Sequence, residues 1–266
     1  MKPSLFECTR KNELVDVWND FCNELMHTNR FFTNFQSKNI QTTICFNLIL
    51  SAIDYMVNNC EYYVDRKNIL HRARLFNYGK EYSTNEVAIN MSNGIIGFHP
   101  NDMKSPPYDK TKQGRINPEG ISYLYTCDCV ETCIAELKPY INSYISIIDI
   151  KPKKRLKVFS VDSIDYKKAG LEGNIFIDFL KTKFIQPYKT EEGLEYIPTQ
   201  FIAEYIKNKE CDGIKHPSSV SHIGNNVIIF DENKVEFGKT TDLYHINEIT
   251  YKKTEVKSNI SINKGI

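Results

Sequence analysis

Three side chains suited to chemistry lie close together in the segment Gly114–Leu137, which reads GRINPEGISYLYTCDCVETCIAEL. Arg115 lies in a loop marked by Gly and Pro, Tyr125 ends a short β-like run, and Glu136 lies on a predicted helix. A cation, an aromatic hydroxyl and a carboxylate on three successive elements can surround one small ligand if the chain folds back like a hairpin. We therefore expect a ligand site in this segment.

The helix that carries Glu136 is predicted by its spacing. Asp128 is a favourable N-cap residue, and Glu131 follows three positions later as a capping-box partner. Glu136 has no such role and flanks the apolar face, where a carboxylate needs a positive or hydrogen-bonding neighbour. The simpler alternative is a solvated carboxylate on the helix surface. The predicted apolar face consists of Val130, Cys133, Ile134 and Leu137.

An arginine pair lies on a predicted strand further towards the N-terminus. The segment Leu70–Phe76, LHRARLF, has a period of two, which places Arg72 and Arg74 on one face. Such a pair usually faces solvent, and it also suits an anion site where that face lines a cleft.

A loop rich in hydroxyl and amide groups, HPSSVSHIGNN, begins at His216 and ends at Asn226. Ser218 and Ser219 are ordinary loop serines on one interpretation and part of a polar ligand pocket on the other. A hydrolase triad of Ser218, His216 and Asp212 is disfavoured, because residues so close on one strand and loop rarely converge and the chain has no G-x-S-x-G elbow.

Composition excludes several classes of function. The 266 residues include 34 basic and 33 acidic side chains, so no overall charge favours nucleic acid or an anionic membrane as a partner. The most apolar stretch, Ile44–Val57, is too short and too polar to span a bilayer, and the N-terminus lacks the pattern of a signal peptide. We expect a soluble, cytoplasmic protein.

Eight cysteines raise the question of a metal site. Cys127, Cys129 and Cys133 form a C-x-C-x3-C cluster, but no fourth ligand lies nearby, and Cys133 already belongs to the predicted core face. Packing of reduced thiols is the preferred interpretation, and we expect no metal.

The remaining pattern predicts an α+β fold with a helical N-terminus. Apolar residues recur at helical spacing in the segments 14–25 and 42–58, so residues 1–66 are expected to form a helical extension and residues 67–266 a catalytic domain. Further strands are expected at 145–150, 156–161, 214–216, 227–230 and 246–251, and helices at 175–184 and from Pro198 onward.

Four blocks together resemble the RES domain, a family named for Arg, Glu and Ser residues in that order. They are HRARLF, the segment from Gly114 to Leu137, TQFIAEYIKNKECDGIKHPSS and GNNVIIF, and they cover about residues 69–237. The resemblance implies a split β-core similar to that of the ADP-ribosyltransferases, with flanking helices and NAD+ as substrate. It also implies the toxin of a toxin–antitoxin pair, and hence an inhibitory antitoxin as partner.

The resemblance also implies roles for individual residues. Glu136, Arg72 and Ser218 match the catalytic positions, and Arg74 is the neighbour most easily confused with Arg72. The expected NAD+-binding residues are Arg72, Arg74, Arg115, Tyr125, Ser219 and Asn226.

The chemistry of these residue types suits the cleavage of NAD+ that the resemblance implies. Arginines bind the pyrophosphate through paired, charge-assisted hydrogen bonds, and a carboxylate stabilises the oxocarbenium-like transition state that forms as nicotinamide leaves. The expected activity is an NAD+ glycohydrolase or phosphorylase, with ADP-ribosyl transfer to a protein as the alternative.

Two other classes stay open. Arg66 and His71 form an R-x4-H pair similar to the signature of HEPN ribonucleases, although His71 belongs to the predicted strand of Arg72. The last alternative is a binding module without catalytic activity.

Overall fold

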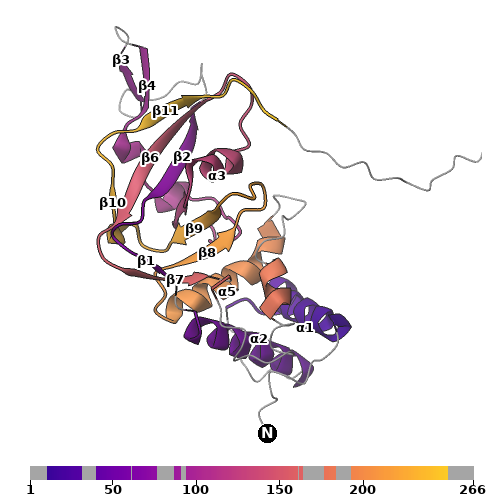
Figure 1. Cartoon of the computed structure of the whole chain (residues 1–266). Helices are drawn as coiled ribbons and strands as arrows, with labels where there is room; N and C mark the ends of the chain where they lie inside the picture. The colour runs from indigo at the N-terminus through magenta and orange to yellow at the C-terminus, as the bar shows by residue number, and fades with distance from the viewer. Residues whose placement is uncertain are drawn as a thin grey trace, which may run out of the picture.

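The computed structural model describes residues 11–31, 40–60, 62–76, 87–90, 94–160, 162–163, 177–183 and 193–250. These residues form an α+β fold in which a bent mixed sheet lies against a layer of helices (Figure 1). The expected fold class is therefore confirmed. The α-helices are α1 Lys11–Asn23, α2 Ile40–Asn58, α3 Val130–Glu136 and α5 Ile197–Asn208, and residues 177–183 are also helical. Shorter helical turns are η1 Glu24–Thr28, η2 Pro100–Met103, η3 Tyr108–Lys110, η5 Gly193–Tyr196 and η6 Glu232–Lys234.

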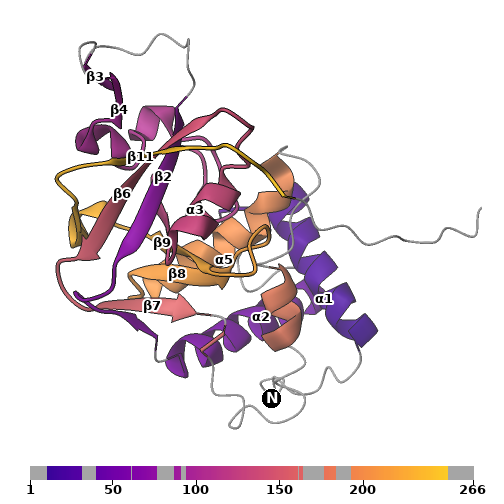
Figure 2. The same cartoon turned by 45° about the horizontal axis from the view of Figure 1, so that its top comes forward.

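The strands follow the predicted alternation in most places. They are β1 Tyr63–Val64, β2 Leu70–Phe76, β3 Val87–Asn90, β4 Gly94–Phe98, β5 Leu124–Cys127, β6 Tyr144–Pro152, β7 Leu156–Ser160, β8 Gly213–Pro217, β9 Asn225–Ile229, β10 Val235–Phe237 and β11 Asp242–His245. β3 and β4 pair as a separate hairpin that projects from the sheet (Figure 2).

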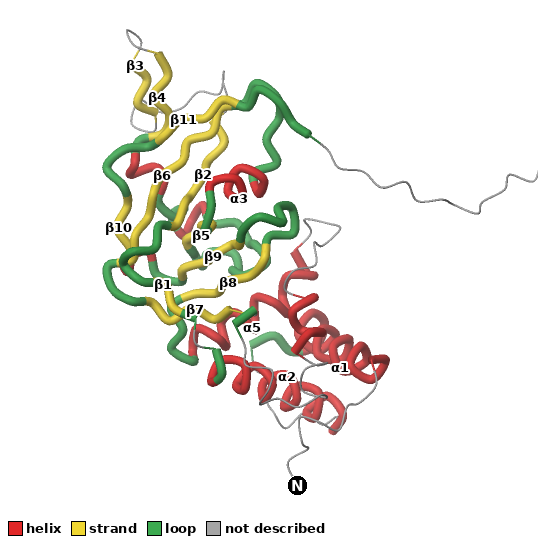
Figure 3. Tube along the Cα trace, viewed as in Figure 1, coloured by secondary structure: helices red, strands yellow, loops and turns green. Residues whose placement is uncertain are grey.

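The main sheet is almost divided at one place. Its order is β1-β7-β8-β9-β5-β2-β6-β10, with β11 also paired to β6. β2 pairs with β6 along its whole length, but it meets β5 only at His71 and Cys127. Figure 3 shows that β2 and β6 run at a steep angle to β8 and β9. This near-division is the split core that was expected, and the strands diverge beyond the His71 pair.

The N-terminal helices pack against one half of the sheet. α1 and α2 share a hydrophobic core with α5, residues 177–183 and the inner faces of β8 and β9 (Figure 2). The five apolar residues of the predicted helical pattern are all buried: Leu14, Val17, Trp18 and Phe21 on α1, and Leu25 on η1. β1, at the end of the segment 1–66, pairs with β7. The division of the chain after residue 66 stays a prediction. In the described ranges, no helix is both long enough and apolar enough to cross a bilayer.

Two local predictions are wrong. Asp128 does not cap α3: Cys129 precedes the helix without a capping hydrogen bond, and the Asp128 carboxylate instead accepts from the main-chain and side-chain nitrogens of Asn225, both at 2.7 Å. The last strand is Asp242–His245, because the chain meets the free edge of β6 several residues earlier than expected, and residues 246–250 are irregular. Residue 251 lies outside the described ranges.

Candidate active site

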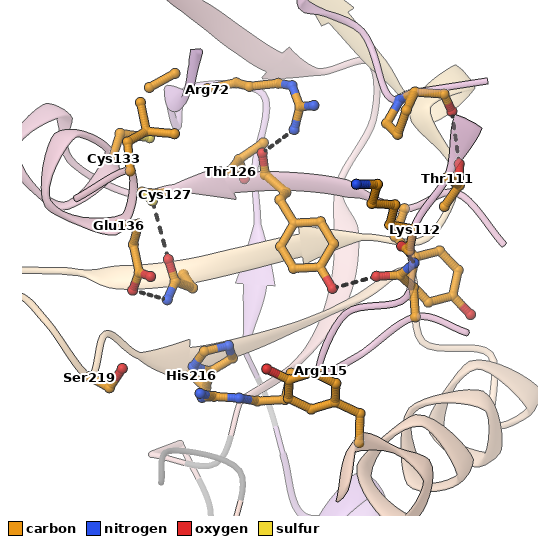
Figure 4. Close-up of a pocket in the computed structure, with 18 residues that line it drawn as sticks. Arg72, Thr111, Lys112, Arg115, Thr126, Cys127, Cys133, Glu136, His216 and Ser219 are labelled. Carbon is orange, nitrogen blue, oxygen red and sulfur yellow. Dashed lines mark hydrogen bonds between the residues drawn. The ribbon is translucent and has the colours of Figure 1, made fainter. Parts of the chain in front are cut away.

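A cavity of about 490 Å³ opens where β2 and β5 diverge, and we call it the first cavity. Six of the eight residues expected to form the site line it. Figure 4 shows Arg72 and Arg115 on opposite sides of this space, with Glu136 on a third side. The six are Arg72, Arg115, Tyr125, Glu136, Ser219 and Asn226.

Glu136 is the last residue of α3, and its carboxylate is fixed by two side chains. Oε1 accepts hydrogen bonds from Ser218 Oγ at 2.7 Å and from Asn226 Nδ2 at 2.6 Å. The described residues donate nothing to Oε2, which leaves that oxygen for a ligand. The half-buried Glu136 thus has the hydrogen-bonding neighbours that its position requires, and the solvated-surface alternative does not describe it.

Ser218 does not line the first cavity itself, but it supports the carboxylate from behind. Its buried hydroxyl donates to Glu136 and accepts from the main-chain N–H groups of Val220 and Ser221, at 3.2 and 2.9 Å. Asn226 is held in turn by Cys127, whose thiol donates to Asn226 Oδ1 at 3.3 Å. The donors to Glu136 are therefore themselves oriented, which fixes the carboxylate more firmly than isolated contacts would.

The loop between β8 and β9 reaches α3 because of a glycine. A Cβ at Gly224 would lie 2.6 to 2.7 Å from side-chain atoms of Asp128, Cys129 and Thr132. Only glycine permits this approach, which places Ser218 beside Glu136.

Arg72 lies at the divergence of the two strands. Its Nη1 donates to the main-chain oxygen of Tyr125 at 2.9 Å, which bridges β2 and β5 beyond their last pair. Burial, together with the positive charge of Arg74, lowers the pKa of Arg72 to about 10. Arg74 points elsewhere: its Nη2 donates to Lys104 O at 2.8 Å, and it does not line the first cavity. Of the two arginines, Arg72 is the one that shares a cavity with Glu136.

Arg115 is positioned by the first turns of α5. Thr199 Oγ1 donates to Arg115 O at 2.7 Å, and Gln200 Nε2 donates to Gly114 O at 2.8 Å. Asn117 organises the same loop, because its Nδ2 donates to three main-chain oxygens at 3.1 Å each. A buried amide that crosslinks its own loop explains why the GRINPEG segment keeps one shape.

Tyr125 joins this loop to the sheet. Its hydroxyl donates to Asn117 Oδ1 at 2.7 Å, while the residue is 37% exposed. Burial of the hydroxyl raises the pKa of Tyr125 to about 12, so the phenol is neutral at physiological pH. Gly114 is required here, since a Cβ would lie 2.8 Å from the Tyr125 hydroxyl oxygen.

His216 lines the first cavity, and sequence reasoning did not select it for the site. It is 5% exposed and lies opposite Asn226 in the β8–β9 register. Nδ1 lies 2.9 Å from Pro217 O, which can only accept, so Nδ1 carries the proton and Nε2 is an acceptor. Burial lowers the pKa of His216, and Arg115 lowers it further. The available signal was its place as the first residue of the polar loop that carries Ser218 and Ser219.

Ser218, His216 and Asp212 are not arranged as a hydrolase triad. Asp212 accepts from Lys157 N at 2.8 Å and from Lys234 Nζ at 2.6 Å, and Ser218 bonds Glu136 instead of His216.

The cysteines near the site behave as packed thiols. Cys127 and Cys133 are buried, and Cys133 Sγ donates to His71 O at 2.9 Å. The neighbouring Cys133 thiol and burial raise the pKa of the Cys127 thiol. Within the described part of the chain, no three His, Cys, Asp or Glu residues gather as a group that could hold a metal ion.

The R-x4-H pair gains no support from the structure. His71 lies on β2 with Nδ1 2.9 Å from Asp149 Oδ1, and Arg66 lies in the turn before that strand. Neither residue lines the cavity that holds Glu136.

Comparison with known families agrees with this geometry. The family model described as the RES domain matches residues 97–250, more than half of the chain. The chain belongs to the RES domain family. The matched region of the RES domain contains Arg115, Tyr125, Glu136, Ser218 and Asn226 and begins after β2, so the assignment of Arg72 rests on its position in the cavity.

One solved structure shows a weak overall similarity to the chain. It is the crystal structure of the M. tuberculosis MbcT–MbcA toxin–antitoxin complex, with 9% sequence identity and a TM-score of 0.38. The alignment covers 74% of this chain and 92% of the matched chain. No curated protein sequence matches the chain.

Proposed function

We propose that this RES domain protein cleaves the nicotinamide–ribose bond of NAD+ and thereby consumes the dinucleotide. The observation that carries the proposal is the fixed carboxylate of Glu136 in a cavity that Arg72 and Arg115 also line. Membership of the RES domain family supports the same substrate class.

The bond breaks with both electrons going to the ring nitrogen of nicotinamide, which becomes neutral as it leaves. Positive charge develops on the ribose, and Glu136 stabilises it through its charge and through Oε2, which is open to a ribose hydroxyl. Arg72 and Arg115 bind the diphosphate with charge-assisted hydrogen bonds. The ring of Tyr125 offers an aromatic surface to nicotinamide, and its hydroxyl stays on Asn117.

The biological role that fits this reaction is that of a toxin held inactive by an antitoxin. An enzyme that removes NAD+ without restraint stops metabolism, so we expect a protein inhibitor that covers or distorts the cavity. The RES family assignment supports this role.

The test is to incubate the purified protein with NAD+ and to follow nicotinamide release by chromatography, with RNA in a parallel reaction. Free ADP-ribose as product indicates water as acceptor, ADP-ribose 1-phosphate indicates phosphate, and ADP-ribose retained on protein indicates transfer. NAD+ binding without nicotinamide release would indicate a binding module and would contradict the proposal.

A further inference from the structure

A second cavity of about 1150 Å³ adjoins the first, and the proposed chemistry does not use it. The two cavities share Arg72, Ala73, Pro106 and Leu137 in their walls, so they adjoin at Arg72. The rest of the second cavity is lined by β2, by Ser122 and by residues of the segments 98–110 and 230–233. It is therefore a neighbouring space for the part of a ligand that is longer than the first cavity.

The boundary between the cavities carries two guanidinium groups side by side. Arg72 Nη2 and Arg74 Nη2 both donate to Lys104 O, at 3.4 and 2.8 Å. Both arginines line the second cavity. Guanidinium groups bind phosphate oxygens through paired, charge-assisted hydrogen bonds, and a diphosphate offers oxygens to both arginines.

Unpaired polar atoms concentrate in the same wall. Four buried side-chain polar atoms in the described residues lack a hydrogen-bond partner, and three of them belong to residues that line the second cavity. These three atoms are Arg72 Nε, Asp102 Oδ2 and Ser105 Oγ. A buried polar group without a partner is costly, so this cluster points to a polar ligand. The carboxylate of Asp102 requires a hydrogen-bond donor, such as a ribose hydroxyl.

An exposed aromatic ring lines the second cavity. Tyr108, on η3, is 78% exposed and lines the cavity. Its loop is fixed, because Thr111 Oγ1 donates to Pro107 O at 2.8 Å and Ser122 Oγ donates to Pro106 O at 2.6 Å. An exposed ring on a fixed loop is a suitable surface for a nucleotide base.

We propose that the second cavity binds the adenosine diphosphate half of NAD+. The diphosphate, which Arg72 and Arg115 contact from the first cavity, also contacts Arg74; the adenosine ribose donates to Asp102, and adenine stacks on Tyr108. This assignment rests on the proposed function, because it places the nicotinamide half of the same molecule beside Glu136.

The first test is calorimetric titration of ADP, which does not require turnover. Tyr108→Ala should weaken ADP binding by about fivefold or more, since stacking on one aromatic ring commonly contributes that much. Tyr140→Ala is the matched control, because Tyr140 is also exposed and lines neither cavity. Equal affinities for ADP in the wild type and Tyr108→Ala would overturn the assignment, as would no ADP binding to the wild type.

A second pair of titrations tests the ribose contact. Asp102→Ala should weaken the binding of ADP and leave the binding of 2′,3′-dideoxy-ADP unchanged. Asp109 is exposed and does not line the cavity, so Asp109→Ala should change neither affinity. Equal losses for both nucleotides would remove Asp102 from the site.

Kinetics separate this inference from the proposed function. Tyr108→Ala should raise the KM for NAD+ and leave both kcat and the use of nicotinamide mononucleotide unchanged. If Tyr108→Ala releases nicotinamide from NAD+ with an unchanged KM, the assignment of the second cavity to the adenosine half is wrong, and the proposed function stands. ADP binding that depends on Tyr108, without nicotinamide release by the wild type, contradicts the proposed function alone.

Discussion

Glu136 Oε1 and Asn226 Nδ2 lie 2.6 Å apart, although the two residues are 90 positions apart in the chain. The contact joins the end of α3 to the start of β9, the strand that pairs with β5. Ser218 reaches the same oxygen from the β8–β9 loop, so three elements determine where the negative charge lies. The predictions below remove these interactions one at a time.

Asn226→Ala should lower kcat for nicotinamide release by about 10- to 100-fold, because one hydrogen bond to a charged group contributes about 1.5 to 3 kcal/mol. The KM for NAD+ should change less, since Asn226 acts by positioning Glu136. Asn47→Ala, at an exposed position of α2, is the control. A folded Asn226→Ala variant with wild-type kcat would show that the contact does not position the carboxylate.

Arg72→Ala should lower kcat/KM for NAD+ by about 10- to 100-fold, and more than Arg74→Ala does, because Arg72 lines both cavities. Arg72→Lys should restore only part of the loss, since an ammonium group offers a point charge in place of a planar fork. Steady-state kinetics on the purified variants gives both values. Full activity in Arg72→Ala together with loss in Arg74→Ala would reverse the assignment of the two arginines.

His216 should make the folded protein sensitive to acid. Burial lowers its pKa below the ordinary value of 6.5, Arg115 acts in the same direction, and Pro217 O, Glu136 and Asp162 oppose them. Below about pH 6.5 the unfolded chain binds a proton that the folded protein does not, so the free energy of unfolding falls as pH decreases, by at most about 1.4 kcal/mol per pH unit.

Thermal melting of the wild type and His216→Gln between pH 7 and pH 5 tests this dependence. The wild type should lose stability more steeply than His216→Gln, and His222→Gln, at an exposed position, should follow the wild type. Parallel curves for the wild type and His216→Gln would exclude a neutral buried imidazole at this position.

The sequence predicts helices and strands well where buried residues recur at regular spacing along the chain. The spacing of Leu14, Val17, Trp18 and Phe21 predicts α1 because one face of that helix is buried, and the alternation in Leu70–Phe76 predicts β2 because the strand lies in a sheet. Asp128 was misjudged for the converse reason. Its N-cap preference is local, whereas Asn225, nearly a hundred positions away, provides two stronger hydrogen bonds for its carboxylate.

The types of residue at the site could be predicted, but their contacts could not. Nothing local indicates that Ser218 and Asn226 meet one oxygen of Glu136, because that meeting depends on how β5, β8 and β9 pair. His216 was missed for the same reason. Its place beside Asn226 follows from the β8–β9 register, and the second cavity follows from how the loop after β4 folds over β2.

The comparison of Glu136→Gln with Glu131→Gln tests the central claim most directly. Glu136→Gln keeps the size of the side chain and an oxygen for Ser218 and Asn226 but removes the charge, so kcat for nicotinamide release should fall far more than NAD+ affinity. Glu131 is exposed on the same helix, and its substitution should cost about 1 kcal/mol or less of stability and leave kcat unchanged. With thermal melting to show that both variants are folded, we predict loss of nicotinamide release in Glu136→Gln alone. Equal release by the two variants would contradict the assignment of Glu136 as the catalytic carboxylate.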